Sequence, residues 1–103
     1  MSKSIVQKNT DKCYLCHRNG RTDPLELHHV YFGANRKWSE KYGITVYLCG
    51  NGCHRNGENA VHRNAQVCRR LQMTAQKKAM AYYGWTVADF RAVFGRNYLD
   101  KEE

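Results

Sequence analysis

The sequence predicts a small α+β fold, and three observations support that prediction. Two short apolar runs, residues 25–32 and 44–48, are each typical of a strand. Two segments in which apolar residues recur at helical spacing, 65–83 and 87–94, follow them. Two pairs of cysteines flank the predicted strands, a pattern that is common in small domains stabilised by a metal ion.

The first predicted strand contains two adjacent histidines, His28 and His29, in the run that begins at Leu25. Successive side chains on a strand point to opposite faces of the sheet, so the two imidazoles are expected to point in opposite directions. We therefore expect the two histidines to have different roles.

A polar and basic connection with interleaved aromatic residues joins the two predicted strands. Residues 35–42 predict a short helical turn within it, and Gly43 is a favourable residue to end that turn. Residues 44–48 are β-branched and apolar, so they form the predicted return strand. The connection is long for a hairpin, and long connections often carry function.

Capping residues mark the predicted helices beyond the second cysteine pair. Asn59 is a favourable N-cap for a helix that begins near Ala60. The helical period continues as far as Gly84, which ends it. Thr86 and Asp89 then resemble a capping box at the start of a second, shorter helix.

The chain has 103 residues and a net charge of +8, which predicts one domain and a polyanionic partner, most commonly nucleic acid. No apolar run is long enough to span a membrane, and the N-terminus lacks the apolar core of a signal peptide. We therefore expect a cytoplasmic protein, where thiols stay reduced and paired cysteines more often hold metal than form disulfides.

The cysteines predict a structural zinc site. Cys13 and Cys16 form a C-x-x-C pair, and Cys49 and Cys53 form a C-x-x-x-C pair. Four thiolates in two pairs suit tetrahedral zinc, and the alternative is two unrelated pairs of buried thiols. Cys68 lies in a helical pattern with apolar neighbours and is most simply a buried core thiol.

Basic residues dominate the C-terminal part of the chain, where Asp89 is the only acid between residues 63 and 98. A charge run is ordinarily a solvated helix face, but so uneven a balance favours a surface that faces nucleic acid. The residues expected to contact nucleic acid are Arg36, Arg55, Arg63, Arg69, Arg70, Lys77 and Lys78.

The order of the histidines suggests chemistry. If the two strands pair and a helix packs across them, His28, His54 and His62 can converge on one side. A divalent ion beside a neutral imidazole is the arrangement that phosphodiester hydrolysis needs. An imidazole can also accept a proton from water near neutral pH.

These stretches together resemble the HNH endonuclease family, most closely the small phage-type members built on a zinc-stapled scaffold. The resemblance covers residues 13–99 and is carried by Leu27-His28-His29-Val30, Val46-Tyr47-Leu48-Cys49, Cys53-His54 and Val61-His62, with support from residues 33–43 and 94–99. It implies a ββα-metal core with a treble-clef-like zinc site, followed by helices. The expected division within a single nuclease domain 1–103 is a core over residues 13–64 and basic helices over 65–99. Residues 1–12 are polar and basic with no clear period, so they predict an N-terminal arm that is a solvated tail, with lysines that contact phosphate as the alternative.

The resemblance also implies roles for individual residues. His28 would bind the catalytic metal, His29 would be the general base, and His54 and His62 would complete the metal site. Asn59 is an alternative ligand to His62, and Asn35 and Asn59 are the candidates for the motif asparagine. The catalytic ion is Mg²⁺, Mn²⁺, Ni²⁺ or Zn²⁺, and an all-imidazole site favours the last three over Mg²⁺.

The expected function is a metal-dependent DNA endonuclease that nicks double-stranded DNA and leaves 5′-phosphate and 3′-hydroxyl ends. The alternative is a non-catalytic zinc-stapled module that binds nucleic acid or protein, and an RNA-directed nuclease is a third hypothesis. Changing His29 to Ala separates the first two, since a binder has no need of that residue. By resemblance we expect the cytoplasm of a bacterial host cell, a phage or host protein partner, and a monomer or weak dimer.

Overall fold

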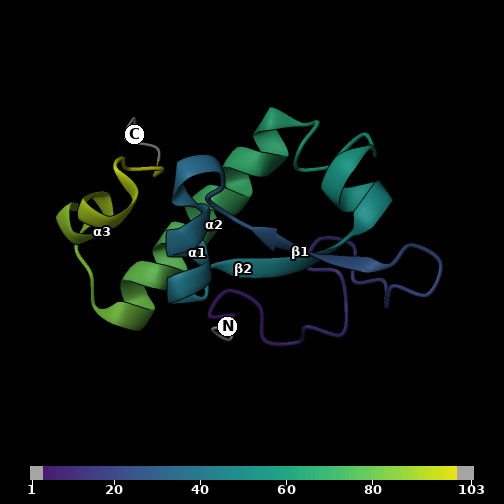
Figure 1. Cartoon of the computed structure of the whole chain (residues 1–103), viewed down its shortest axis with the longest axis horizontal. Helices are drawn as coiled ribbons and strands as arrows, with labels where there is room; N and C mark the ends of the chain where they lie inside the picture. The colour runs from purple at the N-terminus through teal and green to yellow at the C-terminus, as the bar shows by residue number, and fades with distance from the viewer. Residues whose placement is uncertain (1–3, 100–103) are drawn as a thin grey trace.

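The computed structural model describes residues 4–99 and shows an α+β fold with a two-stranded antiparallel sheet (Figure 1). Strand β1 (Leu25–His29) pairs with β2 (Thr45–Cys49), with Leu25 opposite Cys49 and His29 opposite Thr45. The remaining elements are the short helical turns η1 (Gly33–Asn35) and η2 (Gly50–Arg55) and the helices α1 (Arg36–Tyr42), α2 (Ala65–Tyr83) and α3 (Val87–Phe94). The predicted α+β class and the order of its strands and helices are confirmed.

Local signals for α1 and α3 are present as predicted. Gly43 ends α1 in the left-handed region, with φ of 71°. At the start of α3, Thr86 Oγ1 accepts from the Asp89 N–H at 3.2 Å, and Asp89 Oδ2 accepts from the Thr86 N–H at 2.9 Å. Both signals depend only on neighbouring residues, which is why the sequence could show them.

The start of α2 differs from the prediction. Asn64 is its N-cap, with Oδ1 accepting from the N–H groups of Gln66 at 3.0 Å and Val67 at 3.2 Å, so the helix begins at Ala65 and not near Ala60. Ala60 is fully buried, and the chain passes through the core before the helix starts. Asn59 and Asn64 are equally suitable caps by residue type, and tertiary packing selects the second.

One apolar core joins the sheet to α2 and α3. Tyr31 follows β1 and lies at its centre, with its ring centroid 5.4 Å from that of Phe90, 4.7 Å from that of Phe94 and 4.6 Å from that of Tyr98. The residues of α2 that face this core are Leu71, Ala75, Gln76 and Ala79. Ser39 secures α1 to it by donating to the Tyr31 carbonyl and accepting from the Tyr31 N–H.

The N-terminal segment is not a solvated tail over the residues that the structure describes. The Ile5 N–H donates to the Gly43 carbonyl at 2.8 Å, and the Tyr47 N–H donates to Gln7 Oε1 at 2.7 Å. Val6 is 3 % exposed. The segment therefore supplies hydrogen-bond partners for the backbone of β2 along the edge that does not pair with β1. This pairing leaves no hydrophobic periodicity in the sequence from which it could be predicted. Residues 1–3 of the predicted arm lie outside the described range, and no helix within residues 4–99 has the length and apolar character needed to cross a membrane.

Candidate metal centres

The four paired cysteines form one cluster. Cys13 and Cys16 come from the turn before β1, Cys49 ends β2, and Cys53 lies on η2, with their sulfur atoms all within 4.8 Å of one another. The Cys16 N–H points at Cys13 Sγ at 3.4 Å, and Cys16 Sγ lies 3.2 Å from Cys49 Sγ. The predicted convergence of the two pairs is confirmed, and the cluster could hold a structural metal ion.

Electrostatics in this cluster favour a cation. Burial raises the pKa of Cys49 to about 12 and also raises that of Cys53. Burial acts in the same direction on Cys13, but the backbone N–H groups of Cys16, Cys49 and Leu15 outweigh it and lower the pKa of that thiol to about 7. Cys13 can therefore lose its proton first, and a bound cation would stabilise the remaining thiols as thiolates. Four sulfur donors are a typical zinc set.

Three histidines form a second cluster. His28 projects from β1, His54 from η2 and His62 from the turn before α2, and one ring nitrogen of each lies within 4.8 Å of the others. The His54 and His62 Nε2 atoms are 3.1 Å apart. The His28 ring centroid is 5.1 Å from each of the other two. The structure thus brings together the three residues that the sequence placed on one side of the fold.

His28 is the buried member of this histidine cluster. It is 2 % exposed, and its Nε2 atom is buried with no hydrogen-bond partner among the described residues. Burial, reinforced by the charges of His54 and His62, lowers the pKa of His28 to about 3, so the ring is neutral at neutral pH. A buried nitrogen without a partner costs roughly 1–3 kcal/mol, and a metal ion bound by the three imidazoles would supply the partner.

Glu26 orients His54, and the sequence analysis missed it. Glu26 Oε1 accepts from His54 Nδ1 at 2.8 Å, and its other oxygen accepts from Arg55 Nη2 at 2.8 Å. The hydrogen bond from His54 is the largest of the effects that lower the pKa of Glu26. Since a carboxylate only accepts, Nδ1 carries the proton, and the lone pair on Nε2 faces the cluster. The available signal was spacing, because Glu26 and His28 share one face of β1.

The η2 turn that carries Cys53 and His54 is held by specific contacts. Asp23 accepts from the N–H groups of Asn51 at 2.9 Å and Gly52 at 2.8 Å, and these bonds lower the pKa of its carboxyl. A Cβ atom at Gly57 would lie 1.9 Å from the Gly52 carbonyl oxygen, so only glycine fits there. The turn therefore positions two consecutive residues, Cys53 and His54, in two different clusters.

His29 is the next residue of β1 after His28 and does not join the histidine cluster, in agreement with the alternation of side chains along a strand. Its Nε2 lies 2.7 Å from Glu40 Oε1 on α1. The ring borders an open cavity of about 590 Å³ that Arg36 and Lys37 also line. Because Glu40 accepts, the proton of a neutral His29 ring sits on Nε2 and Nδ1 keeps a lone pair. Glu40 is a second residue that the sequence analysis did not single out.

The predicted basic residues lie in several parts of the fold. Arg36 lies at the His29 cavity, Arg55 is bonded to Glu26, and Arg63 Nη1 donates to the Asn56 carbonyl at 2.9 Å. The others are exposed along α2, and these are Arg69, Arg70, Lys77 and Lys78.

The two asparagine candidates and the fifth cysteine lie in different surroundings. Asn35 Nδ2 donates to the Phe94 carbonyl at 3.0 Å, so it braces η1 against the end of α3. Asn59 Oδ1 accepts from Asn64 Nδ2 at 3.4 Å. Cys68 is partly buried against the core, and burial raises the pKa of its thiol.

Comparison of the chain with protein-family models, with curated proteins and with solved structures finds no match. The functional argument therefore rests on the side chains themselves and on their surroundings.

Proposed function

We propose that this protein is a metal-dependent DNA endonuclease of the HNH type, with a ββα-metal core. The observation that carries the proposal is the buried, unpartnered Nε2 of His28, whose ring lies in one cluster with those of His54 and His62. Three imidazoles with converging nitrogens are a ligand set for a divalent transition metal. A protein that only bound DNA would have no need of this cluster.

Four residues would build the site of the divalent ion. His28, His54 and His62 would hold the divalent ion, and Glu26 would keep His54 in the tautomer that binds it. Such an ion neutralises charge on the scissile phosphate and on the leaving oxygen. An all-imidazole set favours Zn²⁺, Ni²⁺ or Mn²⁺ over Mg²⁺.

His29 would act as the general base, with Glu40 as its positioning residue. Glu40 keeps the ring proton on Nε2, which leaves Nδ1 to take a proton from the attacking water. The water oxygen forms a bond to phosphorus and the bond to the 3′ oxygen breaks. That oxygen takes up a proton, and the products are a 5′-phosphate and a 3′-hydroxyl.

The cysteine cluster would support this site through the backbone. Cys53 and His54 are consecutive residues of η2, so an ion held by the four cysteines would restrain the turn that presents His54. Preorganisation of this kind matters because catalytic groups must be held close to their productive geometry.

The charge of the chain suits DNA as the substrate. The net charge is +8, and Arg36 and Lys37 line the cavity beside His29. Arginine and lysine at such a position neutralise phosphates without reading sequence. A single site of this kind cuts one strand, so the expected product from supercoiled plasmid is the nicked circle.

The test is nicking of supercoiled plasmid by the purified chain, first with EDTA and then with Mg²⁺, Mn²⁺, Ni²⁺ or Zn²⁺ added singly. His29→Ala is expected to lower the rate by about a hundredfold or more while metal content and melting temperature stay the same. Glu58→Gln, a change at an exposed residue that belongs to neither cluster, is the control and is expected to nick at the parent rate.

Two results would reject the proposal. One is equal nicking by the parent chain and by His29→Ala, which would indicate a contaminating nuclease or a different base. The other is an absence of nicking with every metal while a gel shift with duplex DNA persists. That second result would establish the non-catalytic binding module in place of the nuclease.

A further inference from the structure

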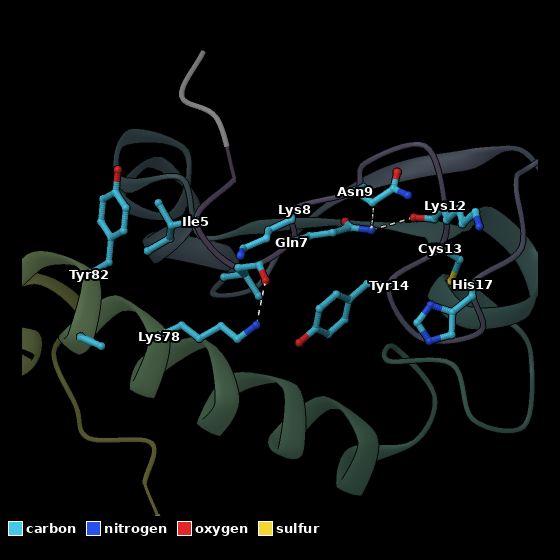
Figure 2. Close-up of a pocket in the computed structure, with 12 residues that line it drawn as sticks. Ile5, Gln7, Lys8, Asn9, Lys12, Cys13, Tyr14, His17, Lys78 and Tyr82 are labelled. Atoms are coloured by element: carbon cyan, nitrogen blue, oxygen red, sulfur yellow. Dashed lines mark hydrogen bonds between the residues drawn. The ribbon is translucent and has the colours of Figure 1, made fainter.

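An open groove of about 810 Å³ lies between the N-terminal segment and α2 (Figure 2). It belongs to the edge of β2 that faces away from β1, because the Tyr47 N–H bonds to Gln7 and the Tyr47 carbonyl accepts from the Tyr14 N–H at 2.8 Å. The histidine cluster is built from β1 and from the chain that follows β2, and none of its residues lines the groove.

The groove is cationic. Lys8 and Lys12 contribute from the N-terminal segment and Lys78 contributes from α2, and all three are exposed. The described residues that line it include no aspartate or glutamate. Lysines in a groove whose lining contains no acid attract an anionic ligand.

Two of these lysines sit on a loop with internal support, and the third is tethered. Gln7 Nε2 donates to the carbonyls of Asn9 at 2.9 Å and Lys12 at 2.7 Å, which shapes the loop that carries Lys8 and Lys12. Lys78 Nζ donates to the Val6 carbonyl at 3.0 Å (Figure 2). An ammonium group has three donors, so Lys78 can also donate to a ligand in the groove.

Aromatic rings accompany the charge. Tyr14 is half-buried beneath Lys78, whose Nζ lies 5.9 Å from its ring centroid. Tyr82 borders the groove and is 67 % exposed, far more than a tyrosine side chain ordinarily is. An exposed ring beside lysines, such as that of Tyr82, is a surface on which an unpaired base stacks, whereas a duplex keeps its base faces covered.

We propose that this groove binds single-stranded nucleic acid, with bases stacked on Tyr14 and Tyr82 and phosphates paired with Lys8, Lys12 and Lys78. The site goes beyond the nuclease proposal: of its lining residues only Cys13 belongs to either cluster, and none of them borders the cavity at His29. The occupant is a strand with unpaired bases, of DNA or of RNA.

His17 offers a variant that separates binding from folding. It lines the groove and has φ of 66°, a left-handed conformation that glycine adopts more readily than histidine. His17→Gly removes the ring from the groove without straining the backbone. It is expected to melt at or above the parent temperature and to bind a single strand more weakly.

Binding is measured by fluorescence anisotropy with a labelled oligothymidylate, at low salt, with the zinc-loaded chain and no added divalent ion. Lys78→Gln and Tyr82→Ala are each expected to weaken binding roughly tenfold. Lys41→Gln is the matched control, since it removes the same charge from an exposed lysine on α1 that does not line the groove. It is expected to change the affinity by less than about twofold.

Three outcomes would overturn the proposal: no binding of the oligonucleotide by the parent chain, equal weakening by Lys41→Gln and Lys78→Gln, or competition by polyglutamate as strong as that by oligothymidylate. The proposal is supported if unlabelled oligothymidylate or oligouridylate competes more strongly than polyglutamate does. Whichever of the two oligonucleotides competes more strongly identifies DNA or RNA as the tighter ligand. Because anisotropy does not read cleavage, a chain that nicks plasmid but binds no oligonucleotide rejects only this site. A chain that binds but never nicks rejects only the nuclease.

Discussion

The cysteine cluster and the histidine cluster meet at consecutive residues of the chain but differ in how many donors they offer to a metal ion. Consecutive residues, Cys53 and His54, contribute one donor to each. The cysteines supply four donors, and two of them, Cys13 and Cys49, are almost completely buried. The histidines supply three donors, and each cluster has one exposed member, Cys16 or His62.

This difference fits the structural role proposed for the cysteines and the chemical role proposed for the histidines. A tetrahedral ion held by four protein ligands is closed to other molecules, whereas one held by three keeps a position for water or substrate. Under the proposed function, an ion at Cys53 would fix the backbone of η2, and a second, accessible ion would be held at the next residue, His54. The following changes are designed to test that division, beginning with the largest expected effect.

Cys49→Ser should destabilise the whole chain. Loss of a donor from a closed site removes most of the metal affinity that stabilises the fold, and the expected fall in the free energy of unfolding is roughly 4 kcal/mol or more. Urea unfolding together with zinc analysis measures both effects. Cys68→Ser is the control and should keep the zinc content of the parent, since Cys68 lies outside the cluster. Unchanged stability and zinc content in Cys49→Ser would contradict a structural metal site.

Glu26→Gln should act on the histidine cluster alone. An amide cannot replace the charge of a carboxylate toward His54 Nδ1, so affinity for a divalent ion at the histidines is expected to fall by about 10- to 100-fold. Calorimetric titration of Ni²⁺ into the zinc-loaded chain measures this affinity, and Glu58→Gln is the matched control. The stability conferred by the cysteine cluster should not change. A fall in melting temperature as large as that of Cys49→Ser would show that the two clusters are not separate.

Glu40→Gln should affect the rate of nicking but not the binding of metal. Without the carboxylate, the His29 ring loses the partner that selects its tautomer, and the rate is expected to fall by about tenfold or more. The pH profile of nicking should change with it, because the group beside the base no longer carries a charge. Plasmid nicking across a pH series, with Ni²⁺ affinity measured in parallel, tests this. Parent-like rates at every pH would exclude Glu40 as a positioning residue.

Acid should destabilise the chain through His28 when the histidine cluster holds no metal ion. Burial lowers the pKa of this imidazole to about 3 in the folded state, against about 6.5 in the unfolded chain. Between these values the unfolded chain binds a proton that the folded chain does not, so the free energy of unfolding falls as the pH falls. The slope from this residue is at most about 1.4 kcal/mol per pH unit.

The contribution of His28 can be isolated by comparing slopes. Urea unfolding between about pH 7.5 and pH 5.5 is measured for the parent and for His28→Leu, which cannot take up a proton. The variant should show the shallower dependence on pH, and equal slopes would mean that His28 titrates normally in the folded chain. Protonation of the cysteine site contributes to both chains alike and cancels from the difference.

Local signals in the sequence determined much of the framework. The stop at Gly43, the capping box of Thr86 and Asp89, and the opposite directions of His28 and His29 all follow from dihedral preferences, side-chain reach or strand geometry within a few residues. The cysteine spacings and the order of the histidines also anticipated which donors meet. None of these inferences required knowing how distant segments pack.

Only the tertiary structure decided which neighbours those residues have. Asn64 rather than Asn59 caps α2, and Glu26 and Glu40 take positions beside His54 and His29. The groove of Lys8, Lys78 and Tyr82 exists because the N-terminal segment covers the open edge of β2. The physical reason is common to all of these features. Each feature either joins residues that are far apart in the chain or depends on a choice between two residues of the same type. The position that a segment takes against the rest of the fold is determined by burial of the whole core, not by the composition of the segment.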